Sequence, residues 1–220
     1  MVHCNNCTSD LNAWVGLFKE YQELLGIPVD MNEVYGKLYN NALNGDTDCG
    51  GLISYNYISG EPLTGLSEGR PLFVRSANDK FNLANFIRTH LYASVGVLKL
   101  GNDILFNDEK VRVDRITGHG GLFKTKGVGQ RILAAAINSP ISVMETAGEG
   151  GAWGIALLAS YLVNNTNKQS LADYLDEVVF AGDAGVEIKP TKEDVAGFNK
   201  YIENYKACLA IEEAAVKAKN

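Results

Sequence analysis

Residues 115–130 read RITGHGGLFKTKGVGQ and hold the residue pattern with the clearest chemical potential. Gly118, Gly120 and Gly121 follow a β-branched run, and a helical pattern resumes after them. Glycine lacks a Cβ and tolerates positive φ, so a glycine turn lets the backbone approach a ligand closely. A helix N-terminus beyond the turn presents free N–H groups and a partial positive charge of about half an electron unit. In α/β folds this arrangement holds nucleotides and phosphates.

The glycine cluster alone fits a tight turn as well as a ligand-binding loop. A Walker loop needs a wider glycine gap closed by Gly-Lys-Ser/Thr, and the dinucleotide pattern needs a third glycine at a spacing that is not met here. Lys124 and Lys126 are placed to contact a phosphate or ribose, although lysines in a first helical turn are usually only solvated. His119 is either a nucleotide contact or an exposed loop residue.

Other chemically capable residues favour structural roles. His3, Cys4 and Cys7 make part of a zinc-binding spacing, but no second pair follows and structural zinc takes four ligands, so we predict no metal site. Asp10 precedes an apolar helical stripe and is interpreted as a helix cap rather than a catalytic base. Gly150 opens an apolar helix, where it either packs against the glycine turn or contacts a purine.

The composition is that of an ordinary globular protein, with 46% hydrophobic and 21% charged residues among 220. The formal net charge of -6 argues against nucleic acid or an anionic lipid surface as a partner. There is no apolar run of about 18 residues to predict a membrane span, and the N-terminus lacks the features of a signal peptide. We therefore expect a cytoplasmic protein whose four scattered cysteines stay reduced.

Strands and helices alternate along the chain, which predicts an α/β sheet with crossover helices. Residues 61–80 hold prolines and glycines and are read as a surface loop. The amphipathic tail at about 191–219 either packs on the domain or forms the surface of a homodimer. Strands are expected near 2–5, 52–57, 111–117 and 141–144, joined in one sheet. The other helices are expected from a cap at residues 8–10 to about 25, at 32–43 and 83–100, from the glycine turn to about 137, and at 150–163.

Four stretches, taken in order, carry a family resemblance. They are GGLISYNYISGE at 50–61, NLANFIRTHLYASVGVLKLG at 82–101, ITGHGGLFKTKGVGQRILAAAINSPI at 116–141 and ETAGEGGAWGIALLAS at 145–160. Together they resemble the C-terminal domain of the FGGY family of carbohydrate kinases, which has the actin/Hsp70-like (ribonuclease H-like) ATPase fold. The third is similar to the family's adenosine-binding strand, Gly-Gly turn and helix. The resemblance covers about residues 1–165, and the spacing between the motifs fits as well.

The resemblance implies that the whole protein transfers the γ-phosphoryl group of ATP, with Mg²⁺, to a hydroxyl of a ketose, such as the pentuloses xylulose and ribulose. Residues 1–220 would be the C-terminal nucleotide-binding domain of a two-domain kinase, without the N-terminal domain and the start of this domain. The family's catalytic Asp and its phosphate turns precede the matched region. We therefore expect no catalytic residue in this chain and no activity from it alone. Adenosine would lie over the turn, at Gly118, Gly120, Gly121, Leu122, Lys126 and Gly150.

Three departures from the family pattern leave adenine binding in place and the sugar open. Residues 62–64 read Pro-Leu-Thr where the family usually has Arg-Thr-Pro, residues 95–97 lack its frequent Glu, and Lys126 stands where it usually has Asn. The main alternative is an actin/Hsp70-like ATPase or a regulatory nucleotide-binding domain with no sugar substrate. The third reading is an interaction domain in which the glycines merely turn the chain.

Overall fold

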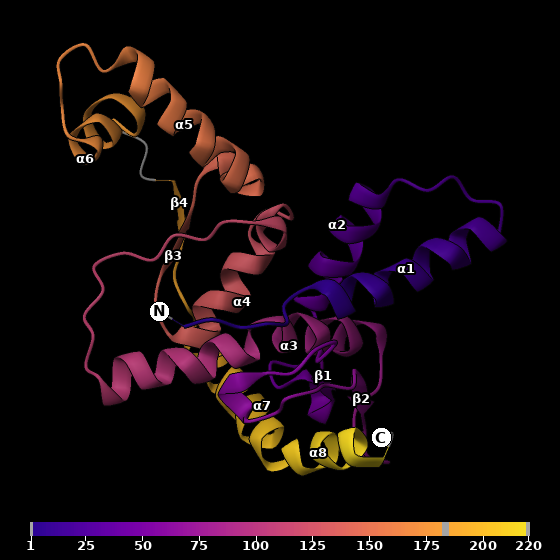
Figure 1. Ribbon diagram of the computed structural model, residues 1–220. Coiled ribbons are helices and arrows are strands. Elements are labelled where there is room, and N and C mark those ends of the chain that lie inside the picture. The colour runs from indigo at the N-terminus through magenta and orange to yellow at the C-terminus, as the bar shows by residue number, and fades with distance from the viewer. Residues whose placement is uncertain (1, 182–184, 219–220) are drawn as a thin grey trace.

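The computed structural model describes residues 2–181 and 185–218, which fold into helices and four short strands (Figure 1). The strands are β1 (Ile53–Tyr55), β2 (Leu72–Val74), β3 (Ile141–Val143) and β4 (Val186–Ile188). The α-helices are α1 (Ser9–Leu24), α2 (Met31–Ala42), α3 (Leu83–Asp103), α4 (Val128–Ile137), α5 (Gly150–Asn164), α6 (Leu171–Tyr174), α7 (Lys192–Ala207) and α8 (Leu209–Ala218).

Helix α3 lies at the centre of the hydrophobic core. Its N-cap is Asn82, whose side chain accepts a hydrogen bond from the Asn85 N–H and so satisfies one of the free donors of the first turn. The helix packs against α2, α4 and β1, and its side chains Arg88 and Tyr92 contact α7. Residues 87–97 are all buried, so α3 is enclosed on every side rather than along the single apolar stripe that its sequence predicts.

The predicted helices are confirmed in place and approximate length. Helix α1 has Thr8 as its N-cap and is followed by Gly26 in the left-handed region at φ 70°, where glycine is the favoured residue. The tail is helical as expected but consists of α7 and α8, separated at Cys208. Lys219, at the end of the predicted helical tail, lies outside the described residues.

The mixed α/β class is confirmed, but the prediction of one sheet is wrong. Among the described residues the named strands form two antiparallel pairs, β1 with β2 and β3 with β4. Tyr55 lies opposite Leu72 in the first pair, and Val143 lies opposite Val186 in the second. Strand β2 falls inside the segment that was predicted to be a surface loop.

Two predicted strands are absent from the described residues, because neither segment pairs with a strand along its length. Residues 2–5 form no strand, because the Asn5 N–H donates to the Glu61 carboxylate at 3.0 Å instead of to a strand. Within 111–117, Thr117 alone takes strand pairing, in an isolated parallel bridge with Ser142 of β3. A β-ladder needs partners along its length, and this segment has one pairing position.

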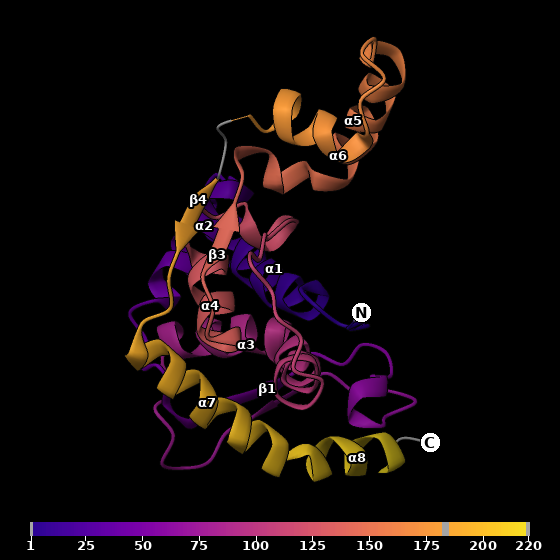
Figure 2. The ribbon, with the colours of Figure 1, turned by 90° about the vertical axis from the view of Figure 1, so that its left-hand side faces the viewer.

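Helices α5 and α6 extend away from the body of the molecule, as both views show (Figures 1 and 2). None of the residues of α5 is buried. Across residues 2–181 and 185–218, no helix combines the length and the apolar character needed to cross a membrane.

Candidate functional site

The glycine turn leads into its helix later than predicted. Gly121–Phe123 form a single 3-10 turn, and α4 begins at Val128, after Gly127 in the left-handed region at φ 82°. Because Gly127 breaks the helical path, Lys124 and Lys126 lie in the connection between the 3-10 turn and α4. The prediction that they occupy the first helical turn is therefore wrong.

The turn glycines have different physical roles. A Cβ on Gly118 would lie 2.5 Å from the Phe123 ring, so the packing of this ring excludes a side chain there. Gly120 has φ 108°, a conformation that L side chains rarely adopt, and its N–H donates to the Ala147 carbonyl at 2.8 Å. Gly121 has neither constraint, because its φ is not positive and a Cβ would meet no atom within 4 Å.

A pocket of about 470 Å³ separates the turn from helices α1 and α2, and we call it the α1–α2 pocket. Its volume is in the range of small-molecule sites. One wall comes from the turn and the connection to α4, at Gly121, Leu122, Lys124, Thr125 and Lys126. The other wall comes from α1, α2 and the residue before α1, at Thr8, Asn12, Asn32, Tyr35, Gly36 and Tyr39.

The helical wall of the α1–α2 pocket combines aromatic surface with amide groups. The rings of Tyr35 and Tyr39 meet edge to face with centroids 5.5 Å apart, an arrangement that favours a fixed aromatic surface. The Tyr35 hydroxyl donates to Asn12 Oδ1 at 3.0 Å, and burial raises the pKa of Tyr35 above its usual value. The neutral phenol and the amide of Asn12 therefore offer hydrogen bonds without a charge.

The positive charge of the site comes from the turn side. Lys124 Nζ is paired with Glu149 Oε1 at 2.7 Å. Both residues, together with Glu145, line another and wider hollow next to the turn. Among the described residues Lys126 has no hydrogen-bond or ion-pair partner, and its side chain is exposed. Both lysines line both hollows, and Lys126 is the one without a partner, so it is the cation that the α1–α2 pocket can offer to an anionic ligand.

The structure brings together some of the residues that the sequence singled out. Gly121, Leu122 and Lys126 line the α1–α2 pocket, whereas Gly118, Gly120 and Gly150 do not. Gly150 packs beside the turn, since a Cβ there would lie 3.1 Å from the His119 ring.

The interpretation of Asp10 as a helix cap is wrong. Thr8 is the N-cap of α1, and the buried carboxylate of Asp10 accepts a hydrogen bond from Trp14 Nε1 at 3.1 Å. The carboxylate is therefore engaged within its own helix and lies outside the α1–α2 pocket lining.

The residues of the helical wall were missed in the sequence. Thr8, Asn12, Tyr35 and Tyr39 lie more than 80 positions before Gly121, and no local motif marks them. The available signal was weak: Tyr35 and Tyr39 are spaced four apart, and therefore lie on one face of a helix.

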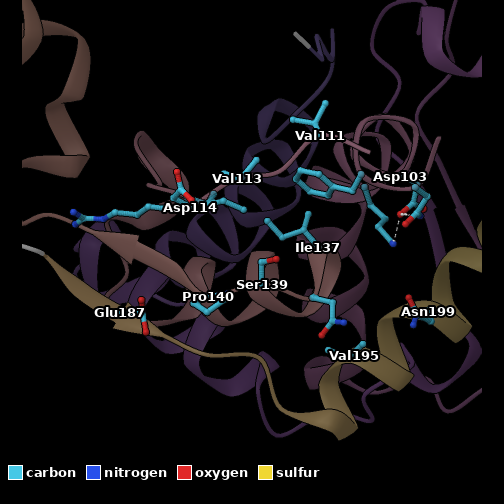
Figure 3. A pocket seen from close by; sticks show the side chains of 16 residues that line it. Asp103, Val111, Val113, Asp114, Ile137, Ser139, Pro140, Glu187, Val195 and Asn199 are labelled. Carbon is cyan, nitrogen blue, oxygen red and sulfur yellow. Dashed lines mark hydrogen bonds and ion pairs between the residues drawn. The ribbon is translucent and has the colours of Figure 1, made fainter. Parts of the chain in front are cut away.

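A separate pocket of about 470 Å³ lies away from the glycine turn, between the end of α3, residues 111–116 and the C-terminal end of α4 (Figure 3). Three carboxylates, from Asp103, Asp114 and Glu187, line it together with two cationic side chains. Lys99, one of those cations, is already paired with Asp103 at 2.5 Å. The excess of negative charge disfavours a phosphate-bearing ligand, so we retain the α1–α2 pocket as the candidate nucleotide site.

Metal binding finds no support in the part of the chain that the structure describes. No group of three or more His, Cys, Asp or Glu side chains there is placed to hold a metal ion. The four cysteines are unpaired, and His3, Cys4 and Cys7 form no such group. A Mg²⁺ ion that is held mainly by nucleotide phosphates and water does not require such a group.

Comparison with known proteins adds a family and a fold. The model of the C-terminal domain of the FGGY family of carbohydrate kinases matches residues 1–163. The structure is similar to xylulose kinase from Lactobacillus acidophilus, with 20% identity, a TM-score of 0.60 and coverage of 80% of this chain and 35% of that one. It is also similar to Plasmodium falciparum glycerol kinase with ADP, with 18% identity, a TM-score of 0.58 and coverage of 90% and 37%.

A third similar structure is gluconate kinase from Lactobacillus acidophilus, with 21% identity, a TM-score of 0.60 and coverage of 80% of this chain and 35% of that one. At these identities the likeness concerns the fold, and the chain spans 35–37% of the length of these kinases. No curated protein sequence matches the chain. The predicted family resemblance and its actin-like ATPase fold are confirmed.

Proposed function

Because the chain belongs to the FGGY family of carbohydrate kinases, we propose that it is the nucleotide-binding domain of a two-domain kinase that uses ATP to phosphorylate a ketose. Residues 1–220 would form the C-terminal domain, and an N-terminal domain would supply the catalytic base and most of the sugar contacts. We place this enzyme in the cytoplasm, where its four unpaired cysteines would stay reduced.

The observation that carries the proposal is the open position at Gly121 in the wall of the α1–α2 pocket. The backbone of the turn can approach a ligand there without interference from a side chain. The tyrosine surface of α2 suits a flat base, the amide of Asn12 suits its polar edge, and Lys126 suits a phosphate or ribose. These groups match the parts of ATP, and glycerol kinase of the same fold has been solved with ADP.

The sugar is proposed as a pentulose, xylulose or ribulose. The support is the family resemblance of the sequence and the fold shared with a xylulose kinase. Mg²⁺ would enter with the nucleotide, whose phosphates would coordinate it, because this chain offers no acidic cluster among its described residues.

The test is a titration of the chain with ATP, by calorimetry, comparing the wild type with Gly121→Val. Since a Cβ at this position meets no protein atom and φ is not positive, the substitution should leave the melting temperature unchanged. Its branched side chain would occupy the place of the ligand and should weaken ATP binding by about 1–3 kcal/mol, roughly tenfold to a hundredfold.

Gly154→Val is the matched control, because Gly154 in α5 also has open space around it and does not line the pocket. It should bind ATP as the wild type does. Unchanged ATP affinity in folded Gly121→Val would show that the glycine turn is only a turn.

A further inference from the structure

Cys4 and Cys7 form a chemically capable pair that the nucleotide site does not use. Residues 4–7 read Cys-Asn-Asn-Cys. Both thiols are free, with Cys7 exposed and Cys4 partly exposed. In the described part of the chain they belong to no group of three or more side chains that could hold a metal ion. Two thiols three positions apart can form an intramolecular disulfide where the backbone between them is curved.

The loop between the two cysteines is curved and anchored. The chain bends at Asn5 and again at Cys7. The backbone N–H groups of Asn5 and Asn6 donate to the same oxygen, Oε2 of the buried Glu61, at 3.0 Å and 3.4 Å. Two successive N–H groups converge on one anion where the backbone curls around it. This curl brings together the two residues that flank it, Cys4 and Cys7.

The two thiols differ in their surroundings. Burial raises the pKa of Cys4 to about 11, with smaller contributions from the charges of Glu61 and Cys7. Because an electrostatic effect falls off with distance, the influence of Cys7 on Cys4 places the two sulfurs near each other. Partial covering of its sulfur also raises the pKa of Cys7, but a hydrogen bond from the Thr8 backbone N–H opposes that rise. Cys7 is therefore the thiol that attacks an oxidant, and Cys4 is the thiol that resolves the product.

Cys7 adjoins the α1–α2 pocket. Thr8, the next residue, lines that pocket and is the N-cap of α1. Tyr39 also lines the pocket, and burial raises its pKa, with further contributions from Tyr35 and Cys7. The sulfur of Cys7 thus lies close to two groups of the pocket wall, the Thr8 N–H and the Tyr39 phenol.

We propose that Cys4 and Cys7 form a reversible disulfide at the edge of the α1–α2 pocket, through exchange with a low-molecular-weight disulfide, and that this disulfide weakens nucleotide binding. The disulfide itself is independent of the proposed function, whereas its effect on the nucleotide rests on it. In a reducing cytoplasm the pair stays as two thiols, and it oxidises when the ratio of small disulfides to thiols rises.

The exchange takes two steps, in which atoms and electrons balance. The thiolate of Cys7 attacks one sulfur of the small disulfide RSSR, which forms a mixed disulfide and releases RS⁻. Cys4 then loses its proton to water as its sulfur attacks the Cys7 sulfur, which forms the Cys4–Cys7 bond and releases a second RS⁻. The protein gives up two electrons and two protons, and the small disulfide takes them up as two RSH.

The disulfide must move the Cys7 sulfur. An S–S bond is about 2.05 Å long, so this sulfur has to leave the Thr8 N–H and turn toward Cys4. The Thr8 carbonyl accepts the first hydrogen bond of α1, from the Asn12 N–H at 2.9 Å. A shift at Thr8 therefore loosens the first turn of α1. Since Thr8 and Asn12 both line the α1–α2 pocket, the wall that offers hydrogen bonds to the ligand changes.

The first experiment places the chain in glutathione buffers of increasing oxidised share and measures its mass after alkylation. In the wild type the peptide with Cys4 and Cys7 should lose both alkylation labels together. Cys4→Ser should instead keep one glutathione on Cys7, because the resolving thiol is gone. Cys208→Ser is the matched control, since it also removes one partly exposed thiol, and it should form the disulfide as the wild type does.

Three results would overturn the disulfide. They are a stable glutathione adduct on Cys7 of the wild type, a disulfide that links two copies of the chain, and a wild type whose Cys4 and Cys7 stay reduced in the most oxidised buffer.

The second experiment titrates the dithiol and disulfide forms with ATP. The disulfide form should bind ATP about threefold to tenfold more weakly. Because coupling between two sites is reciprocal, saturating ATP should disfavour the disulfide by the same factor. Hydrogen exchange of the Asn12 amide should be faster in the disulfide form. Cys7→Ser, which cannot form the disulfide, should bind ATP equally in reducing and oxidising buffer. Equal ATP affinity of the two wild-type forms, or an unchanged Asn12 amide, would overturn the coupling.

The disulfide and the proposed function fail separately. If the disulfide forms and neither form binds ATP, the modification site stands, and the nucleotide site falls together with the coupling. If ATP binds and Gly121→Val weakens it while Cys4 and Cys7 stay reduced, the nucleotide site stands and the modification site does not.

Discussion

At the scale of single residues, His90 shows how burial sets a charge state in this core. It is 1% exposed, and its Nδ1 lies 3.0 Å from Ser54 Oγ. Trp14 and Phe86 lie against its ring, with centroids 5.0 Å and 4.6 Å away. Burial lowers the pKa of His90 to about 3, so the imidazole is neutral in the native protein at any ordinary pH.

This neutral histidine predicts a loss of stability in acid. Below the unfolded-state pKa of 6.5, His90 binds a proton in the unfolded chain but stays neutral in the native chain. The free energy of unfolding therefore decreases as the pH is lowered from about 6.5 to about 3. The slope approaches about 1.4 kcal/mol per pH unit. His90→Gln removes the titration and keeps a partner for Ser54, so its melting temperature should fall less than that of the wild type between pH 7.5 and 5.

Asp10 lies near His90, and burial raises the pKa of its carboxyl. A raised carboxyl pKa contributes the opposite sign, because the native state then holds the proton more tightly than the unfolded state. Since both proteins carry Asp10, the comparison of their pH slopes isolates His90. Equal slopes would contradict the prediction.

At the scale of elements, one buried carboxylate joins three helices. Asp194 of α7 accepts from Arg88 of α3 at 2.9 Å and from Arg131 of α4 at 2.7 Å. The side chains of Asp194 and Arg88 are each 2% exposed. A buried guanidinium without its carboxylate is strongly unfavourable, so this junction fixes how α4, and with it the glycine turn, sits on the core.

Asp194→Ala should therefore lower the free energy of unfolding by about 3–5 kcal/mol, measured by urea denaturation. Lys200→Ala, also in α7, is the control because it breaks an exposed ion pair with Asp48. That loss should be much smaller, because an exposed ion pair is screened by solvent and contributes little to stability. Similar losses for the two variants would show that the buried junction contributes no more than a surface pair.

The elements themselves were predictable to the extent that their signals are local. Helices depend on a 3.6-residue period that each segment carries in its own sequence, and their positions were correct. Strands depend on neighbours. Residues 111–117 alternate as a strand should, yet Thr117 alone finds a partner. Strand β2 pairs with β1 although Pro71 and Gly69 precede it, because pairing with a buried neighbour outweighs the local turn signal.

At the scale of the whole molecule, the candidate site also has one half that local sequence signals indicate and one half that depends on distant segments. Gly121, Leu122 and Lys126 follow one another in a recognisable pattern, and they line the α1–α2 pocket. The facing wall, with Tyr35 and Tyr39, arises from the packing of α1 and α2 around the core. No sequence pattern near the turn records that packing, so this half of the site could be found in the structure alone.

The last prediction separates nucleotide binding from phosphoryl transfer. The chain should bind ATP and should not phosphorylate xylulose or ribulose by itself. Phosphoryl transfer depends on positioning both substrates and on stabilising charge around the transferred group. The α1–α2 pocket offers space for the nucleotide and one lysine without a partner, Lys126, and no group of three or more metal-binding side chains occurs in the described part of the chain. A coupled assay for ADP should therefore show no turnover above a blank without protein, in a preparation whose ATP binding has been verified by titration.

Gly121→Val distinguishes the chain's own activity from that of a contaminating enzyme. Turnover that is equal in the wild type and in this variant would come from a contaminant and would leave the prediction standing. Turnover that the wild type shows and Gly121→Val loses would belong to the chain itself. It would mean that the general base lies among these 220 residues and that the division of labour between two domains is wrong.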